Sequence, residues 1–136
     1  MESAEYHAFR KQFGTLCGVI DNPMAVATEA YTRDMVSIDV VNSMHLPTKT
    51  TKEKANYLLC CMASRISTCP ESFHEFVRVL KTQKNLIAVA ENLQMEYCEL
   101  KFDLVLSVFI FEFVLSFHIS PIFLHYIVVQ LLHEAV

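Results

Sequence analysis

Two adjacent amphipathic patterns between residues 68 and 97 constrain the fold of this chain more than any other feature. In the first pattern, apolar side chains recur at helical spacing: Phe73, Phe76, Val77 and Leu80. The second pattern repeats that spacing: Leu86, Val89, Ala90 and Leu93. Each pattern places one apolar stripe on a helix, and only residues 81–84 join the two helices. The two helices must therefore cross or run antiparallel, and other elements must cover both stripes.

Two of the predicted helix starts carry a capping-box signature. Thr68 and Glu71 have the required spacing, and Pro70 falls in the first turn, where its missing N–H costs nothing. Thr50 and Glu53 repeat the signature upstream. The pattern therefore predicts that new helices begin near residues 50 and 69.

Four more helices are predicted before residue 68. The first carries Phe9, Phe13, Leu16, Cys17 and Ile20, and Gly14 and Gly18 are expected to weaken or bend it. The second spans 23–33, capped by Asp21 or Asn22, and turns these residues inward: Met24, Ala27, Ala30 and Tyr31. The third spans 37–44 with these inside: Ile38, Val41 and Met44. The fourth has the most regular stripe: Ala55, Leu58, Leu59, Met62 and Ile66.

Composition excludes several classes of protein. The net charge of −4 gives no basic field for nucleic acid, and two glycines in 136 residues argue against phosphate-binding loops and turn-rich β folds. The five cysteines, one an adjacent pair, do not resemble a secreted disulfide framework, and residues 1–13 lack the apolar core of a signal peptide. We expect an all-α protein located in the cytoplasm.

The order of these patterns resembles a known family. The segments KANYLLCCMASRIS and FHEFVRVLKTQKNLIAVAENL look like the last three helices of a caspase-recruitment domain of the death-fold superfamily. The segments HAFRKQF and GVIDNPMAVATEAYTRDMVSIDVV resemble its first three helices. The resemblance implies a six-helix antiparallel bundle over residues 1–98, followed by an apolar C-terminal tail over residues 99–136.

The resemblance also implies a function. Domains of this kind bind other death-fold domains through surfaces of opposite charge, with the acidic side on helices two and three and the basic side on helices one and four. The matching acidic residues here are Glu29, Asp34 and Asp39. The matching basic residues are Arg10, Lys11, Lys52 and Lys54. We expect an adaptor in apoptotic or innate-immune signalling, with other death-fold proteins or further copies of this chain as partners.

Catalytic and metal chemistry have little support. A metal site could be considered at four residues: Cys60, Cys61, Cys69 and His74. However, the adjacent cysteines point about 100° apart on a helix, and the sequence has no C-x-x-C pair. Buried structural thiols are the favoured interpretation. We expect no enzyme activity, no cofactor and no metal.

The tail is open to three interpretations. Residues 104–123 are mostly Leu, Val, Ile and Phe, and HYIVVQLL follows. This composition suits a membrane anchor through residues 104–132, although Glu112, His118 and Pro121 oppose insertion. The tail could instead pack on the bundle as an extra helix, or be no evolved segment, such as a translated intron. The anchor interpretation gives an alternative function, a small tail-anchored protein of an intracellular membrane with a helical cytosolic cap.

Overall fold

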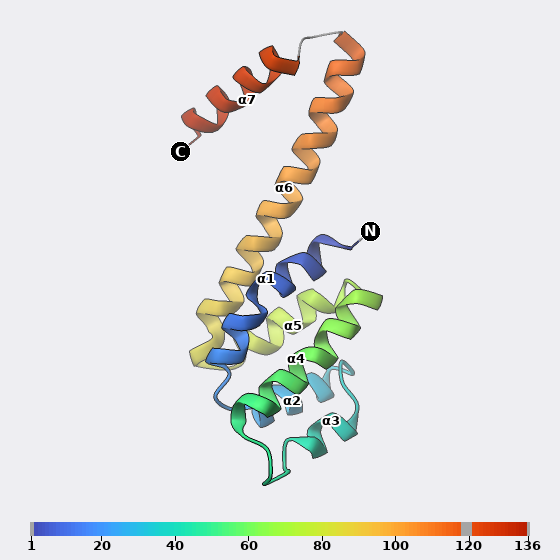
Figure 1. Cartoon of the computed structure of the whole chain (residues 1–136), viewed down its shortest axis with the longest axis vertical. Coiled ribbons are helices and arrows are strands. Elements are labelled where there is room, and N and C mark those ends of the chain that lie inside the picture. The colour runs from blue at the N-terminus through green and yellow to red at the C-terminus, as the bar shows by residue number, and fades with distance from the viewer. Residues whose placement is uncertain (1, 118–120, 136) are drawn as a thin grey trace. The chain divides into compact units, whose positions relative to one another are not determined.

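The computed structural model is all-helical over the residues it describes, 2–117 and 121–135 (Figure 1). Those residues contain no strand, which confirms the all-α prediction for them. The chain divides into two compact units, Met1–Cys98 and Glu99–Val136.

The first unit is built from short helices joined by tight links. They are α1 (Ala4–Val19), α2 (Pro23–Thr32), α3 (Ile38–Ser43), α4 (Thr51–Thr68), α5 (Ser72–Lys81), the 3₁₀ turn η1 (Lys84–Leu86) and the start of α6 (Ile87–Phe117). The start signal at Thr50 is confirmed, because its hydroxyl accepts from the Glu53 N–H and the Glu53 carboxylate accepts from the Thr50 N–H. Asn22 caps α2 by accepting from the Ala25 N–H at 3.2 Å.

Helices α1 and α4 run antiparallel. Tyr6 near the start of α1 and Ser67 near the end of α4 line one cavity. At the opposite end of the pair, Cys17 of α1 contacts Asn56 of α4. Figure 1 shows the same arrangement, with α1 in blue lying beside α4 in green. Gly14 and Gly18 do not break α1, which is one uninterrupted helix.

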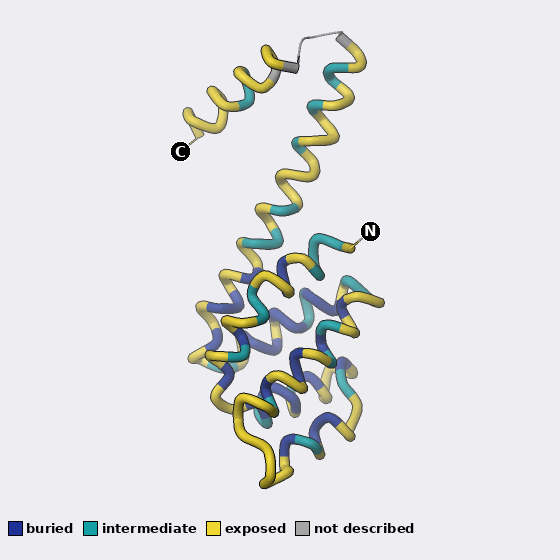
Figure 2. The backbone as a smooth tube through the Cα atoms, in the orientation of Figure 1, coloured by how far each residue is buried: buried dark blue, intermediate teal, exposed yellow. Residues whose placement is uncertain are grey.

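The predicted apolar stripes of the helices form the core of the first unit (Figure 2). Both apolar patterns of residues 73–93 are buried at every predicted position, and so is the whole stripe of α4. The largest rings in this core are Phe9, Phe73 and Phe76, all fully buried. Burying side chains of this size contributes about 1.5–3 kcal/mol each, so the faces of α1 and α5 that carry these rings contribute strongly to the stability of the unit.

Five predicted inward residues of the early helices are not fully buried: Phe13, Cys17 and Met24 are half-buried, and Tyr31 and Ile38 are exposed. Tyr31 is 43% exposed, while Val26, not predicted, is buried. The covered face of α2 lies against α4 and α5, and it centres on Val26, Ala27 and Ala30, one residue's rotation from Tyr31. Met24 is only half-buried for the same reason.

Ile38 is 48% exposed, against the prediction. It is the first residue of the six-residue helix α3, which packs against α2. The buried side chains of α3 are Val40 and Val41, and Met44 follows them as the buried C-cap. A helix this short presents less than two turns, so periodicity alone cannot fix its inner face.

The predicted capping box at Thr68 is wrong. Helix α4 continues through Thr68, whose hydroxyl donates back to the Ser64 and Arg65 carbonyl oxygens. The Glu71 carboxylate accepts from the Cys69 thiol at 3.1 Å and not from the Thr68 N–H, as a capping box would require. Helix α5 therefore starts at Ser72 without a side-chain cap.

The sixth helix does not end near residue 98 as the pattern predicted. Helix α6 continues to Phe117, so it supplies residues to both units. The second unit holds the remainder of α6 and helix α7 (Pro121–Glu134). Many of its large apolar side chains are exposed, among them Phe109, Phe111 and Leu115.

Across residues 2–117 and 121–135, none of the helices combines the length and the apolar character that a bilayer crossing needs. The candidate span at residues 104–123 includes His118 and its two successors, which lie outside the described residues.

Candidate interaction surfaces

The two basic candidates on α1 already have acidic partners within the first unit. Arg10 lies 3.4 Å from the Glu2 carboxylate, and Lys11 lies 2.9 Å from that of Glu96. Glu96 is on α6, so the second pair ties α6 to α1. Exposed pairs of this kind contribute little stability, but they reduce the charge that either cation offers to a partner protein.

Lys52 and Lys54 lie in the first turn of α4. Neither forms an ion pair with any residue that the structure describes. The N-terminal end of a helix carries partial positive charge, which stabilises anions and disfavours cations. Both lysines therefore occupy positions where their charge weakens the helix. Lys52 also lines a cavity of about 320 Å³ with Cys17, Glu53 and Asn56.

Glu29 belongs to an internal network of charges between α2 and α5. The Arg33 guanidinium contacts the Glu29 carboxylate at 3.0 Å and the Glu75 carboxylate at 3.2 Å. Arg78 pairs with Glu75 in turn. These bonds raise the pKa of Arg33, first through the hydrogen bond to Glu29. Glu29 is thus a structural partner of Arg33, a pair that the helical i,i+4 spacing could have signalled, whereas Glu75 lies 42 positions from Arg33 and has no such local signal.

Asp34 ends α2 in an unusual conformation. Its φ of 56° lies in the left-handed region that glycine normally occupies at this position. The Asp34 N–H donates to the Tyr31 carbonyl and the Met35 N–H to the Ala30 carbonyl, which is the Schellman pattern. An anion at the C-terminal end of a helix also opposes the helix dipole. Both effects mean that Asp34 lowers the free energy of unfolding of the domain.

Asp39 lies in the first turn of α3 and is exposed. No ion pair joins it, or Asp34, to another residue of the described ranges. The turn between these two acids borders a groove of about 380 Å³ against the second half of α4, lined in part by Met35, Ser64 and Arg65. The unpaired acids therefore flank a turn that lies against the second half of α4, whereas the unpaired lysines lie in its first turn.

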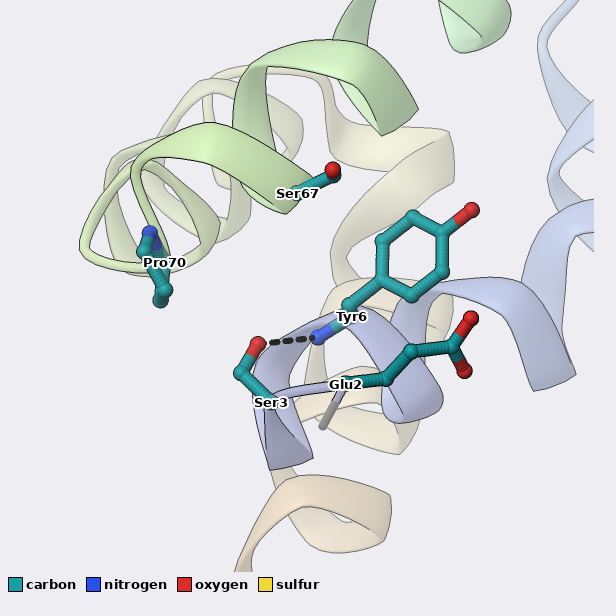
Figure 3. Close-up of a pocket in the computed structure, with 5 residues that line it drawn as sticks. All are labelled: Glu2, Ser3, Tyr6, Ser67 and Pro70. Atoms are coloured by element: carbon teal, nitrogen blue, oxygen red, sulfur yellow. Dashed lines mark hydrogen bonds between the residues drawn. The ribbon is translucent and has the colours of Figure 1, made fainter.

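A second cavity lies where the start of α1 meets the α4–α5 turn (Figure 3). It measures about 320 Å³ and is lined by Glu2, Ser3, Tyr6, Ser67 and Pro70. The Ser3 hydroxyl is already used, because it accepts from the Tyr6 N–H at 3.2 Å. Figure 3 shows the Tyr6 ring lying between the two helices. The lining contains no pair of acid and base that would support catalysis.

The expectation that the cysteines are buried is wrong. Cys60 and Cys98 are exposed, and the other three are half-buried. His74 packs its ring edge-on against Phe73 and Tyr97, with centroids 5.4 and 4.9 Å away. Within residues 2–117 and 121–135 no three His, Cys, Asp or Glu side chains are grouped as a metal site would need.

Comparison with known proteins gave no relative: no family model, no curated protein and no solved structure matches this chain.

Proposed function

We propose that residues 1–98 form a six-helix death-fold domain, most similar to a caspase-recruitment domain. We propose further that this domain is an adaptor that binds other death-fold domains, or further copies of itself, in the cytoplasm. Its pathway would be apoptotic or innate-immune signalling. The sequence resemblance and the packing of short amphipathic helices support this proposal.

One observation carries the proposal. Asp34, Lys52 and Lys54 are unpaired charges, each at the end of a helix whose dipole it opposes. Residues that weaken the fold in which they lie are often retained for function. The acids flank a turn against the second half of α4 and the lysines lie at its start, so one copy can offer an acidic surface to the basic surface of another domain. Complementary charge of this kind accelerates association and fixes the register of the complex.

The ion pairs of the structure reduce the number of candidate residues that can test binding without disturbing the domain itself. Arg10, Lys11 and Glu29 already have internal partners, so their substitution changes the domain itself as well as its surface. Lys52, Asp34 and Asp39 are better probes, because no internal ion pair is lost with them. Among these, Asp39 provides the acidic side and Lys52 the basic side of a two-residue test.

The test compares the full chain with Lys52→Glu, Asp39→Lys and the double variant. Either reversal should weaken self-association, or capture by a panel of purified caspase-recruitment domains, and the double variant should recover part of it. Sedimentation at low and high salt should show weaker assembly at high salt. Lys84→Glu is the control, since Lys84 is exposed on η1 and is not one of the seven predicted contact residues.

Stability measurements separate binding from folding. Lys52→Glu removes an unfavourable cation from a helix start, so its melting temperature should equal or exceed that of the unmodified protein while its assembly falls. The proposal is rejected if both single reversals leave self-association and every death-fold capture unchanged in folded protein.

A further inference from the structure

Two thiols of the first unit lie along the same edge of the α1–α4 pair. Cys17 is in the last turn of α1, half-buried, and Cys60 is in the middle of α4, exposed. Both are free thiols in this structure. The pairing of these two helices brings together residues that are 43 positions apart in the sequence.

The helix geometry directs the two side chains toward each other. Cys17 Sγ lies 3.8 Å from Asn56 Oδ1, and Cys60 is one helical turn beyond Asn56 on the same side of α4. Side chains on a helix lean toward its N-terminus. Because α1 and α4 are antiparallel, Cys17 leans along α1 toward the level of Cys60, and Cys60 leans along α4 toward the level of Cys17.

The electrostatics of the two thiols agree with this proximity. Burial raises the pKa of Cys17, and the neighbouring Cys60 raises it further, while Lys52 acts in the opposite direction. Cys60 is the more accessible of the two. Because Cys60 is exposed, and because the raised pKa of Cys17 leaves less of that residue as the reactive thiolate, Cys60 is the first to react with a dissolved oxidant and Cys17 follows as the resolving thiol.

We propose that Cys17 and Cys60 form a reversible disulfide that ties α1 to α4. The oxidant is a low-molecular-weight disulfide such as oxidised glutathione. The Cys60 thiolate attacks one of its sulfurs and releases one small thiol, leaving a mixed disulfide on Cys60. The Cys17 thiolate then attacks Cys60 Sγ and releases the second small thiol. Two protein thiols are oxidised, and the small disulfide is reduced to two thiols that take up the two protons.

The disulfide would restrict the conformations of the unfolded chain more than it would change the folded structure. It closes a loop that contains α2, α3 and the start of α4, which restricts the unfolded ensemble. Oxidation should therefore raise the melting temperature of the first unit by at least about 5 °C. This inference does not depend on the proposed adaptor function, because it concerns only the α1–α4 pair.

Cys61 provides a matched control for Cys60. It is adjacent in sequence but lines the groove with Met35, Val40 and Ser64, on another face of α4. A disulfide between Cys60 and Cys61 themselves is disfavoured, because neighbouring side chains on a helix diverge by about 100°. Serine at either position leaves the core unchanged, since neither thiol is fully buried.

The experiment treats the reduced full chain with oxidised glutathione, alkylates the remaining thiols and maps linked peptides by mass spectrometry. We expect the five free thiols to fall to three and the linked peptides to contain Cys17 and Cys60. Cys60→Ser should abolish both the link and the rise in melting temperature, and Cys61→Ser should keep both. Any of three results would overturn the proposal: five thiols that remain free, a link through Cys61 or Cys98, or a crosslink between two molecules.

Discussion

The ring of Phe9 on α1 packs edge-on against the ring of Phe76 on α5, with centroids 5.6 Å apart and planes 65° to each other. Both side chains are fully buried. Edge-to-face pairs of this kind add about 0.5–1.5 kcal/mol beyond the area that they bury. This contact joins the first helix to the fifth, so the core depends on residues far apart in the chain.

Truncating a core leucine should therefore be costly. Leu59→Ala and Leu80→Ala each remove a fully buried side chain and should lower the free energy of unfolding by about 2–5 kcal/mol. Leu46→Ala is the matched control, because Leu46 is 43% exposed and should cost much less. Chemical denaturation of the full chain measures all three, and equal small losses would show that the helix faces are misassigned.

The glycines of α1 should be replaceable with a gain in stability. Neither Gly14 nor Gly18 has a positive φ, and a Cβ at either position would meet nothing within 4 Å. Alanine should stabilise the protein by about 0.5–1 kcal/mol at each site, because it lowers the entropy lost when the helix forms. Thermal melts of the two variants test this. A lower melting temperature would mean that the protein needs a bend in α1.

Asp34 should respond to substitution according to backbone conformation. Asp34→Gly should raise the free energy of unfolding by about 1 kcal/mol, since glycine adopts the left-handed region without steric cost. Asp34→Asn should be neutral or mildly stabilising, and Asp34→Ala should destabilise. Denaturation midpoints of the three variants give the ranking. If alanine proved the most stable, the Schellman turn would be absent in solution.

The capping box of α4 should make stability depend on pH. Hydrogen bonds from the backbone and hydroxyl of Thr50 lower the pKa of Glu53 below its ordinary value. Glu53 therefore contributes stability that is fully present above its unfolded-state pKa and is lost as the pH falls through the lower folded-state pKa. Glu53→Gln keeps the cap geometry but cannot titrate. The stability difference between the two proteins should shrink between pH 6 and pH 3, about the range of carboxyl titration, and a constant difference would contradict this account.

Residues 1–98 should fold when expressed alone. Their apolar stripes cover one another within the first compact unit. Circular dichroism should show a helical spectrum and a cooperative melt, as expected for a small domain. A soluble product without a cooperative transition would show that residues 99–136 complete the core.

The sequence predicts best where large apolar side chains repeat along a helix opposite a polar face. Every predicted core position of α4 and α5 is buried, because this pattern leaves only one face that can be covered. Helix α2 is as long as α5 but is rich in alanine, and α3 has fewer than two turns, so the neighbouring helices decide which side is covered and the predictions for Tyr31 and Ile38 are wrong. The end of α6 was missed because the apolar composition after residue 98 continues a helix without any stop signal.

The charged surface is less predictable than the core. The seven candidate residues follow from position in the chain, but their partners do not. Lys11 meets Glu96 at a separation of 85 residues, and no local pattern signals that pair. Only the folded arrangement separates charges with distant internal partners, such as Lys11, from charges that form no ion pair, such as Asp39.

The antiparallel pairing of α1 with α4 also sets a schedule for the chain as it is synthesised. Helix α1 ends at residue 19, and its partner is complete only at residue 68, 49 residues later. At a synthesis rate of about 5–20 residues per second, the apolar face of α1 stays uncovered for about 2–10 seconds until α4 is complete. During that interval Phe9 and Leu16 are open to chaperones and to neighbouring nascent chains on the same messenger.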